Sequence, residues 1–507
     1  MRLRSEILYS LSVRILSLLP LLALSLGAAN AIASSCESLA QLKTPHVSVA
    51  LAAAVTSGHF DATDSPKGLT GLPRFCRVVV QITPTTDSQI GAEIWLPLTD
   101  WNHKLLAVGS GGWGGAISYD ELAAGLQRGY AAGATDDGHT GAGGGFVMGH
   151  PEKLIDFAYR AEHEMTLEAK RLIRALYGEA PAHSYWSGCS GGGREGLLQA
   201  ARYPEEFDGM VVGDPANIRR NAWALSIAVQ TFKDPAAEIP PEKYPMIHQA
   251  VLNACDANDG LKDGLIEDPE RCHVDFRALE CKGADGPSCL TPRQVRSAQA
   301  IISPLKSSTG KILFPRLEPG TELRWARLAG GPEPAALFVD EYRYVVYAKP
   351  DWDWRTFDVD RDAAKAHAID SRVDELDPNL TAFASRGGKL LIYHGWADQQ
   401  VAPRSSVEFY NAAREHSSVK PSRSDWIRLF MVPGMGHCQG GEGPDTFDGI
   451  NALEQWVEKG QAPERIMASQ LNNGQVVRTR PLCPYPQVAR YAKGNPNDAA
   501  SFICRSP

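Results

Sequence analysis

The sequence predicts an α/β protein whose mostly parallel sheet is divided by a large inserted domain. Short apolar strands alternate with helical patterns over residues 34–216, and this alternation resumes over residues 386–507. Residues 217–385 differ, because they hold an acidic loop, four of the ten cysteines and many prolines. Strands that alternate with helices are typical of parallel sheets, so we expect one core built from two segments of the chain.

The N-terminus has the layout of a secretory signal peptide. Arginines at positions 2, 4 and 14 precede or begin an apolar run from Ile15 to Leu26, and Ala31-Ile32-Ala33 fits the cleavage site. This run of about a dozen residues is shorter than the roughly 20 that a membrane span needs. We expect a signal peptide over residues 1–33, a secreted or periplasmic mature protein, and no membrane attachment after cleavage.

The expected elements follow from local composition. Apolar and β-branched runs predict strands over residues 76–81, 89–96, 105–108, 130–135, 184–186, 209–212, 389–393 and 426–432. Apolar residues at helical spacing predict helices over residues 121–129, 156–177, 193–203 and 450–459. A glycine-rich loop, residues 109–115, follows the third strand, and Gly178 is placed to end the second helix.

Ten cysteines, all outside the expected signal peptide, indicate up to five disulfides in an exported protein. The sequence alone does not choose among the many pairings of ten cysteines. Proximity suggests four pairs: Cys36–Cys76, Cys255–Cys272, Cys281–Cys289 and Cys483–Cys504. This pattern leaves Cys189 and Cys438, which lie far apart in the chain.

Charge and spacing argue against several classes of function. A net charge of -8 disfavours a nucleic-acid partner, which would require a basic surface. The cysteines contain no C-x-x-C pair, so they are not spaced for zinc. The sequence also lacks a His/Asp cluster of the kind that a metal-dependent hydrolase needs.

Gly188-Cys189-Ser190-Gly191-Gly192 fits the pattern G-x-S-x-G between an expected strand and an expected helix. In the α/β-hydrolase fold this strand–turn–helix is the nucleophile elbow, where glycines permit a tight turn and the serine hydroxyl is exposed. A plain glycine-rich loop is the alternative, and the flanking strand and helix favour the elbow. Ser190 is therefore the candidate nucleophile.

A serine nucleophile needs a histidine base and an acidic residue that orients the base. α/β-Hydrolases place these residues in the order serine, acid, histidine. Asp398 lies in a loop just past the expected strand 389–393, and His437 follows the expected strand 426–432. Catalytic groups gather at the carboxyl ends of strands, so we predict a triad of Ser190, Asp398 and His437.

The two cysteines left by the proximity pairs flank this triad. Cys189 directly precedes Ser190, and Cys438 directly follows His437. A disulfide between them would clamp the nucleophile beside its base, at the end of a very long loop. In the chain-entropy model such a bond constrains the unfolded state by roughly 4–5 kcal/mol.

Several motifs, taken together, resemble the tannase and feruloyl esterase family from about residue 36 to residue 504. They are Gly188-Cys189-Ser190 with Gly192-Gly193-Arg194, His394-Gly395-Trp396-Ala397-Asp398, and His437-Cys438. The resemblance implies an α/β-hydrolase fold with an inserted lid domain, a serine carboxylesterase activity and a Cys189–Cys438 disulfide. In this fold one oxyanion amide belongs to the residue after the nucleophile, here Gly191. The second comes from a loop after an early strand, where Gly112 is our candidate and a plain glycine-rich turn is the alternative.

The acidic loop that follows Cys255 carries three carboxylates within eight residues. It is not an EF-hand, because Leu261 stands where that loop requires glycine. The resemblance implies a structural calcium site with the side chains of Asp256, Asp259 and Asp263 and the carbonyls of Leu261 and Leu265 as ligands. An acidic surface loop pinned by a disulfide is the alternative, and no organic cofactor is implied.

The resemblance implies hydrolysis of small-molecule esters of aromatic acids through an acyl-enzyme. Feruloyl or related hydroxycinnamoyl esters are the first expectation, before gallate esters and terephthalate monoesters. An inactive secreted binding protein on the same fold is a different class, which the complete triad disfavours; the oligomeric state is left open. Six aromatic residues of the insertion are candidates either for stacking on the acyl group or for the core: Trp325, Tyr342, Tyr344, Trp352, Trp354 and Phe357.

Overall fold

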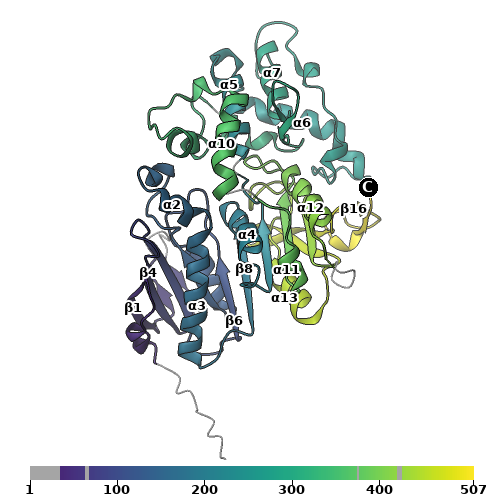
Figure 1. Ribbon diagram of the computed structural model, residues 1–507. Coiled ribbons are helices and arrows are strands. Elements are labelled where there is room, and N and C mark those ends of the chain that lie inside the picture. Colours follow the sequence, from purple (N-terminus) through teal and green to yellow (C-terminus); the bar gives the residue numbers. More distant parts are fainter. Residues whose placement is uncertain (1–34, 63–67, 218, 330, 374–375, 420–424) are drawn as a thin grey trace, which may run out of the picture.

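A computed structural model describes residues 35–62, 68–217, 219–329, 331–373, 376–419 and 425–507 (Figure 1). The expected signal peptide, residues 1–33, lies outside the described residues. Within those ranges, no helix is both long and apolar enough to cross a membrane. All five expected disulfides are formed, and they use all ten cysteines.

The central sheet has nine strands in the order β1-β4-β5-β7-β6-β8-β9-β12-β13. The strands from β7 to β13 in this order run parallel, whereas β1, β4 and β5 pair antiparallel at one edge. This sheet confirms the predicted fold class. Its strands are β1 (Val47–Val55), β4 (Phe75–Ile82), β5 (Ile90–Pro97), β6 (Lys104–Val108), β7 (Ala131–Thr135), β8 (His183–Cys189), β9 (Gly209–Gly213), β12 (Lys389–Gly395) and β13 (Ile427–Val432).

Successive side chains of a strand point to opposite faces of the sheet. Both faces of this sheet carry apolar side chains, and helices cover both. On β8, Trp186 packs into one hydrophobic core and Tyr185 into the other. The first core is covered by α3 (Ala161–Tyr177), α4 (Gly191–Arg202) and α12 (Arg404–His416). The second is covered by α1 (Tyr119–Gln127) and α13 (Gly449–Lys459).

A third hydrophobic core belongs mainly to residues between β9 and β12, which lie above the sheet in Figure 1. These residues add no strand to the central sheet. Their helices are α5 (Arg219–Phe232), α6 (Tyr244–Cys255), α7 (Pro292–Ile301), α8 (Ala326–Ala329), α9 (Ala336–Asp340) and α10 (Val359–Val373). The last helix before β12, α11 (Thr381–Ser385), instead packs into the first core beside the sheet. The remaining elements are α2 (Pro151–Ile155), β2 (His59–Phe60), β3 (Leu69–Thr70), β10 (Leu305–Lys306), β11 (Ile312–Phe314), β14 (Ile466–Asn472), β15 (Gln475–Leu482), β16 (Val488–Tyr491) and β17 (Phe502–Arg505).

The eight expected strands and four expected helices are all present, with two corrections. The helix expected over residues 193–203 begins earlier, at Gly191, because the turn at Ser190 leads directly into it. The helix expected over residues 156–177 is α-helical from Ala161 only, and a wider π turn, Asp156–Arg160, precedes it. Gly178 ends α3 in the left-handed conformation, as predicted.

Candidate active site

Ser190 occupies a strained turn between β8 and α4. Its φ is 61°, a value that non-glycine residues rarely adopt and that is typical of a nucleophile elbow. Glycine is required around it, because a Cβ on Gly188 would lie 2.5 Å from the carbonyl oxygen of Gly192, and one on Gly193 would lie 2.3 Å from that of Gly213. The turn presents the hydroxyl at the N-terminus of α4, where the helix dipole favours developing negative charge.

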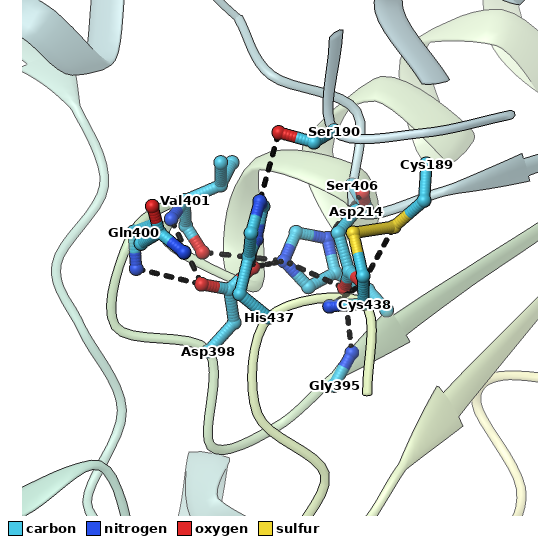
Figure 2. A network of polar contacts seen from close by, with 11 residues as sticks. Cys189, Ser190, Asp214, Gly395, Asp398, Gln400, Val401, Ser406, His437 and Cys438 are labelled. Carbon is cyan, nitrogen blue, oxygen red and sulfur yellow. Dashed lines mark hydrogen bonds and ion pairs between the residues drawn. A yellow bond between two sulfur atoms is a disulfide. The ribbon is translucent and has the colours of Figure 1, made fainter. Parts of the chain in front are cut away.

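The structure brings the three predicted triad residues into one line of hydrogen bonds (Figure 2). Nε2 of His437 lies 2.8 Å from Oγ of Ser190, and Nδ1 of His437 lies 2.6 Å from Oδ2 of Asp398. Because an ionised carboxylate only accepts, Nδ1 carries a proton and donates it to Asp398. Nε2 of the neutral ring is then free to accept the proton of the Ser190 hydroxyl.

Asp398 is completely buried, and both of its oxygens are hydrogen-bonded. Oδ1 accepts the amides of Gln400 at 2.6 Å and Val401 at 3.0 Å, while Oδ2 is also 3.1 Å from Nε2 of His394. Burial alone would raise the pKa of Asp398, but the charges and hydrogen bonds of His437 and His394 outweigh it and hold this pKa well below its usual range. Asp398 therefore remains ionised at neutral pH.

The predicted clamp is present beside the triad. The Cys189–Cys438 disulfide joins the end of β8 to the loop after β13, across a sequence separation of 249 residues, with 5.9 Å between the two Cα atoms. Figure 2 shows the sulfur atoms on the side of His437 away from Gln400 and Val401. The bond therefore holds the backbone next to the nucleophile against the backbone next to the base.

Gly191 and Gly112, the predicted oxyanion-hole residues, line one small cavity beside the elbow. Gly191 is the first residue of α4, and a Cβ built on it would lie 3.4 Å from the amide nitrogen of Gly112. The other wall residues are Trp113, Phe157, Arg194, Ala216, Arg220, Asn221 and Leu337. The sequence analysis did not assign these wall residues, because they come from five separate segments that meet only in the folded chain.

The six aromatic residues of the insertion do not form this wall. Five of them, Trp325, Tyr342, Trp352, Trp354 and Phe357, are buried in the core of the insertion, and Tyr344 is half-buried. The aromatic pair at the cavity is instead Trp113 with Phe157, whose ring centroids lie 5.2 Å apart. A tryptophan inside the glycine-rich loop was the available sequence signal for this pair.

Two further buried residues adjoin the triad, and the sequence analysis gave neither a role. Asp214 follows β9, and His394 is the penultimate residue of β12. Both are 0 % exposed and lie at the same edge of the sheet as Ser190. The available signals were their positions at the carboxyl ends of parallel strands and, for His394, its place in the motif that ends at Asp398.

The acidic loop follows α6 and is closed by the Cys255–Cys272 disulfide. Its carboxylates accept amides of the same loop: Asp256 from residues 263 and 264, Asp259 from Leu261 at 2.9 Å, and Asp263 from Leu265 at 3.3 Å. Asp263 also pairs with the buried Arg480 of β15. Carboxylate and carbonyl oxygens are the ligands that calcium prefers, so the donor set fits this cation.

The fold and the triad together define a serine hydrolase of the α/β-hydrolase class. The chain matches the description "Tannase and feruloyl esterase" over residues 76–505, and it belongs to that family. It is 36% identical over 527 residues to an uncharacterized esterase of Xanthomonas campestris, covering 93% of this chain and 91% of that one. It is 34% identical to a probable feruloyl esterase B-2 of Aspergillus terreus, covering 96% and 98%.

Solved structures agree with this assignment. Feruloyl esterase B from Aspergillus oryzae superposes with a TM-score of 0.88 at 33% identity, over 93% of this chain and 99% of that one. Tannin acyl hydrolase from Aspergillus niger has a TM-score of 0.76 at 24% identity, over 91% and 92%, and shows the shared fold. The protein is thus a carboxylic-ester hydrolase.

Proposed function

We propose that this protein hydrolyses esters of aromatic carboxylic acids through an acyl-enzyme, with feruloyl and related hydroxycinnamoyl esters as its preferred substrates. The observation that carries the proposal is the hydrogen-bonded line from Ser190 through His437 to Asp398. The relatives at 33–36% identity include proteins named feruloyl esterase, which supports this acyl group over gallate. Gallate esters and terephthalate monoesters are the alternatives.

Each residue has a defined task in the proposed reaction. His437 takes the hydroxyl proton of Ser190 as the oxygen attacks the ester carbonyl, and Asp398 stabilises the charged imidazole. The amides of Gly191 and Gly112 stabilise the tetrahedral oxyanion. His437 then protonates the leaving alcohol, and water repeats the sequence on the acyl-enzyme to release the acid.

The chemistry of the residues that line the cavity beside the elbow supports an aromatic acyl group, although the cavity itself, about 30 Å³, is smaller than such a group. Trp113 and Phe157 supply aromatic surface, and Leu337 adds an apolar wall from the insertion. Arg220 and Asn221 place polar groups in the same wall, where they suit the ring substituents of a phenolic acid. An apolar site with a few polar groups is the usual form of a small-molecule pocket.

Hydrolysis of an ester panel by purified protein tests the proposal. The panel is methyl ferulate, methyl gallate, mono(2-hydroxyethyl) terephthalate and short p-nitrophenyl esters, each with wild type, Ser190→Ala and the matched surface control Ser303→Ala. We expect the highest kcat/KM on methyl ferulate, a loss of at least about 1000-fold in Ser190→Ala, and wild-type rates in Ser303→Ala. Near-normal turnover by a folded Ser190→Ala would overturn the triad, and preference for another acid would reassign the acyl group.

We also propose that the acidic loop binds a structural calcium ion through Asp256, Asp259 and Asp263 side chains and the carbonyls of Leu261 and Leu265. Burial and the like charges of its two acidic neighbours raise the pKa of Asp259 to about 6, against the opposing effect of the Leu261 amide and Arg480. A bound cation would remove this electrostatic cost and stabilise the loop.

Calcium removal should lower the melting temperature of the wild-type protein. A ligand at 100 times its dissociation constant stabilises by about 2.7 kcal/mol, so a shift of several degrees is expected on adding chelator, and excess calcium should restore the original value. Asp259→Asn should abolish the response, whereas the exposed lid variant Asp351→Asn should retain it. Identical melting curves with chelator and with calcium would leave the segment as an acidic surface loop.

We further propose export through the N-terminal segment and a lid role for residues 217–385 over a core of residues 34–216 and 386–507. Five disulfides support folding in an oxidising compartment, outside the cell or in the periplasm. Leu337 supports the lid, because it lines the cavity at the elbow and its carbonyl accepts the indole N–H of Trp113 at 3.3 Å.

A further inference from the structure

A second acid–histidine pair lies beneath the triad. Nε2 of His394 faces three acceptors: Oδ2 of Asp398 at 3.1 Å, the carbonyl of Val401 at 3.2 Å and Oδ1 of Asp214 at 3.4 Å. Because none of these oxygens has a proton to donate when the two carboxyl groups are ionised, Nε2 carries the proton. His394 therefore donates to the same carboxylate oxygen that receives Nδ1–H of His437.

The second ring nitrogen of His394 also has a partner. Nδ1 lies 2.7 Å from Oγ of Ser406 in the first turn of α12, and a hydroxyl can accept from a protonated Nδ1. The charged groups that face the ring are Asp214 after β9 and Asp398 after β12, with His437 on the far side of Asp398. Burial lowers the pKa of His394, but the neighbouring carboxylates of Asp214 and Asp398 outweigh it, so this pKa is raised.

Asp214 links the strand ends that carry the triad. Its Oδ1 accepts the amide of Gly395 at 2.8 Å, and its Oδ2 accepts the amide of Cys438 at 2.8 Å (Figure 2). Sγ of Cys189 lies 3.3 Å from Oδ2, in contact but without a proton, since the sulfur is in a disulfide. One buried carboxylate thus binds the backbone at the end of β12 and the backbone next to His437, and it contacts the disulfide next to Ser190.

We propose that Asp214 and His394 form a positioning pair for the triad, in which His394 shares Oδ2 of Asp398 with His437 and thereby sets how strongly His437 holds a proton. The inference rests on the proposed roles of Ser190, His437 and Asp398. In this pair His394, which lies between the carboxyl groups of Asp398 and Asp214, is protonated, and its positive charge on one side of Asp398 disfavours a second positive charge on the other side. His437 therefore stays unprotonated, and able to act as the base, to lower pH than it would beside Asp398 alone.

The pH profile of His394→Gln tests the pair. Glutamine keeps an N–H donor near the position of Nε2 but removes the charge, so we expect the acidic limb of kcat/KM to move to higher pH by about one unit. KM at the plateau should change little. His416→Gln, an exposed histidine on the same helix as Ser406, is the matched control and should keep the wild-type limb. If His394 only supported the local structure, His394→Gln would lower kcat/KM at every pH without moving the acidic limb of the profile.

Ser406→Ala gives a second, milder test if the glutamine variant does not fold. It removes the hydroxyl that accepts from the charged ring, so the limb should move in the same direction by a smaller amount. A limb that stays at the wild-type pH in His394→Gln, or in Ser406→Ala where only that variant folds, would overturn the pair. The pH dependence of inactivation by phenylmethylsulfonyl fluoride reports the same limb without an ester substrate. Full activity in Ser190→Ala would instead overturn the proposed function, so the two failures are distinguishable.

Discussion

At the residue scale, the turn at Ser190 depends on the glycines at positions 188 and 191–193, which have no side chains. Gly193 is the most restrictive position, since a Cβ there would lie 2.3 Å from the carbonyl oxygen of Gly213 and 3.0 Å from Cα of Pro215. The same carbonyl of Gly213 accepts the amide of Ser190 at 2.9 Å. Displacing this contact would therefore move the nucleophile itself.

Gly193→Ala should consequently lower both stability and turnover. Overpacking of this kind costs about 1–3 kcal/mol, and a shift of about 1 Å in a catalytic group can cost on the order of 100-fold in rate. Thermal unfolding and kcat on the best ester of the panel measure the two effects. Gly283→Ala is the control, because a Cβ there meets no atom within 4 Å; a Gly193→Ala enzyme as stable and active as this control would refute the argument.

The sequence was sufficient to select the three residues that the structure joins in one line of hydrogen bonds, because each stands in a motif and their order along the chain is informative. It was not sufficient for Asp214 and His394. Asp214 stands in no motif, and His394 begins the motif that ends at Asp398 without a signal for its own role. The contacts of Asp214 with Gly395 and Cys438 are made with residues that are remote in sequence. The oxyanion glycines are intermediate, since the fold rule located their loops and only the structure shows that both line one cavity.

At the element scale, four neighbouring parallel strands organise the site. β8, β9, β12 and β13 are adjacent in the sheet, and Ser190, Asp214, Asp398 and His437 follow them in that order. No residue of the triad follows β9. Asp214 occupies that position, from which its carboxylate accepts the amide of the last residue of β12 and an amide of the loop after β13.

The strands that were not predicted outside the insertion lack a continuous apolar pattern. β1 is an alanine-rich edge strand with mostly exposed or half-exposed residues, and alanine is a weak strand former. The hairpin β14–β15 is also largely exposed. Central strands such as β6 and β9 were predicted well, because they are buried on both faces and therefore almost wholly apolar.

At the scale of the whole molecule, the Cys189–Cys438 bond connects the two segments of the catalytic core across the insertion. The double variant Cys189→Ser/Cys438→Ser should lose about 5 kcal/mol of stability in the chain-entropy model. Its kcat should fall on the order of 100-fold, because the serine and the base are no longer held together.

Cys281→Ser/Cys289→Ser is the matched control, since that bond closes a separation of only 8 residues within the insertion. The same model gives it about half the stabilising effect, and its kcat should remain at the wild-type value. Chemical unfolding and steady-state kinetics on the two double variants provide the comparison. Equal kcat in both would show that the clamp contributes to stability and not to catalysis.

The Cys189–Cys438 bond can form only late in the synthesis of each chain. Its two sulfur atoms stand 249 residues apart, so the second arrives only after the whole insertion has been synthesised. The bond then closes only where thiols can oxidise. A newly made chain in a reducing compartment would thus lack the covalent link between the loops of the serine and the base, and under the proposed export this link would form only after the chain had left the cytosol.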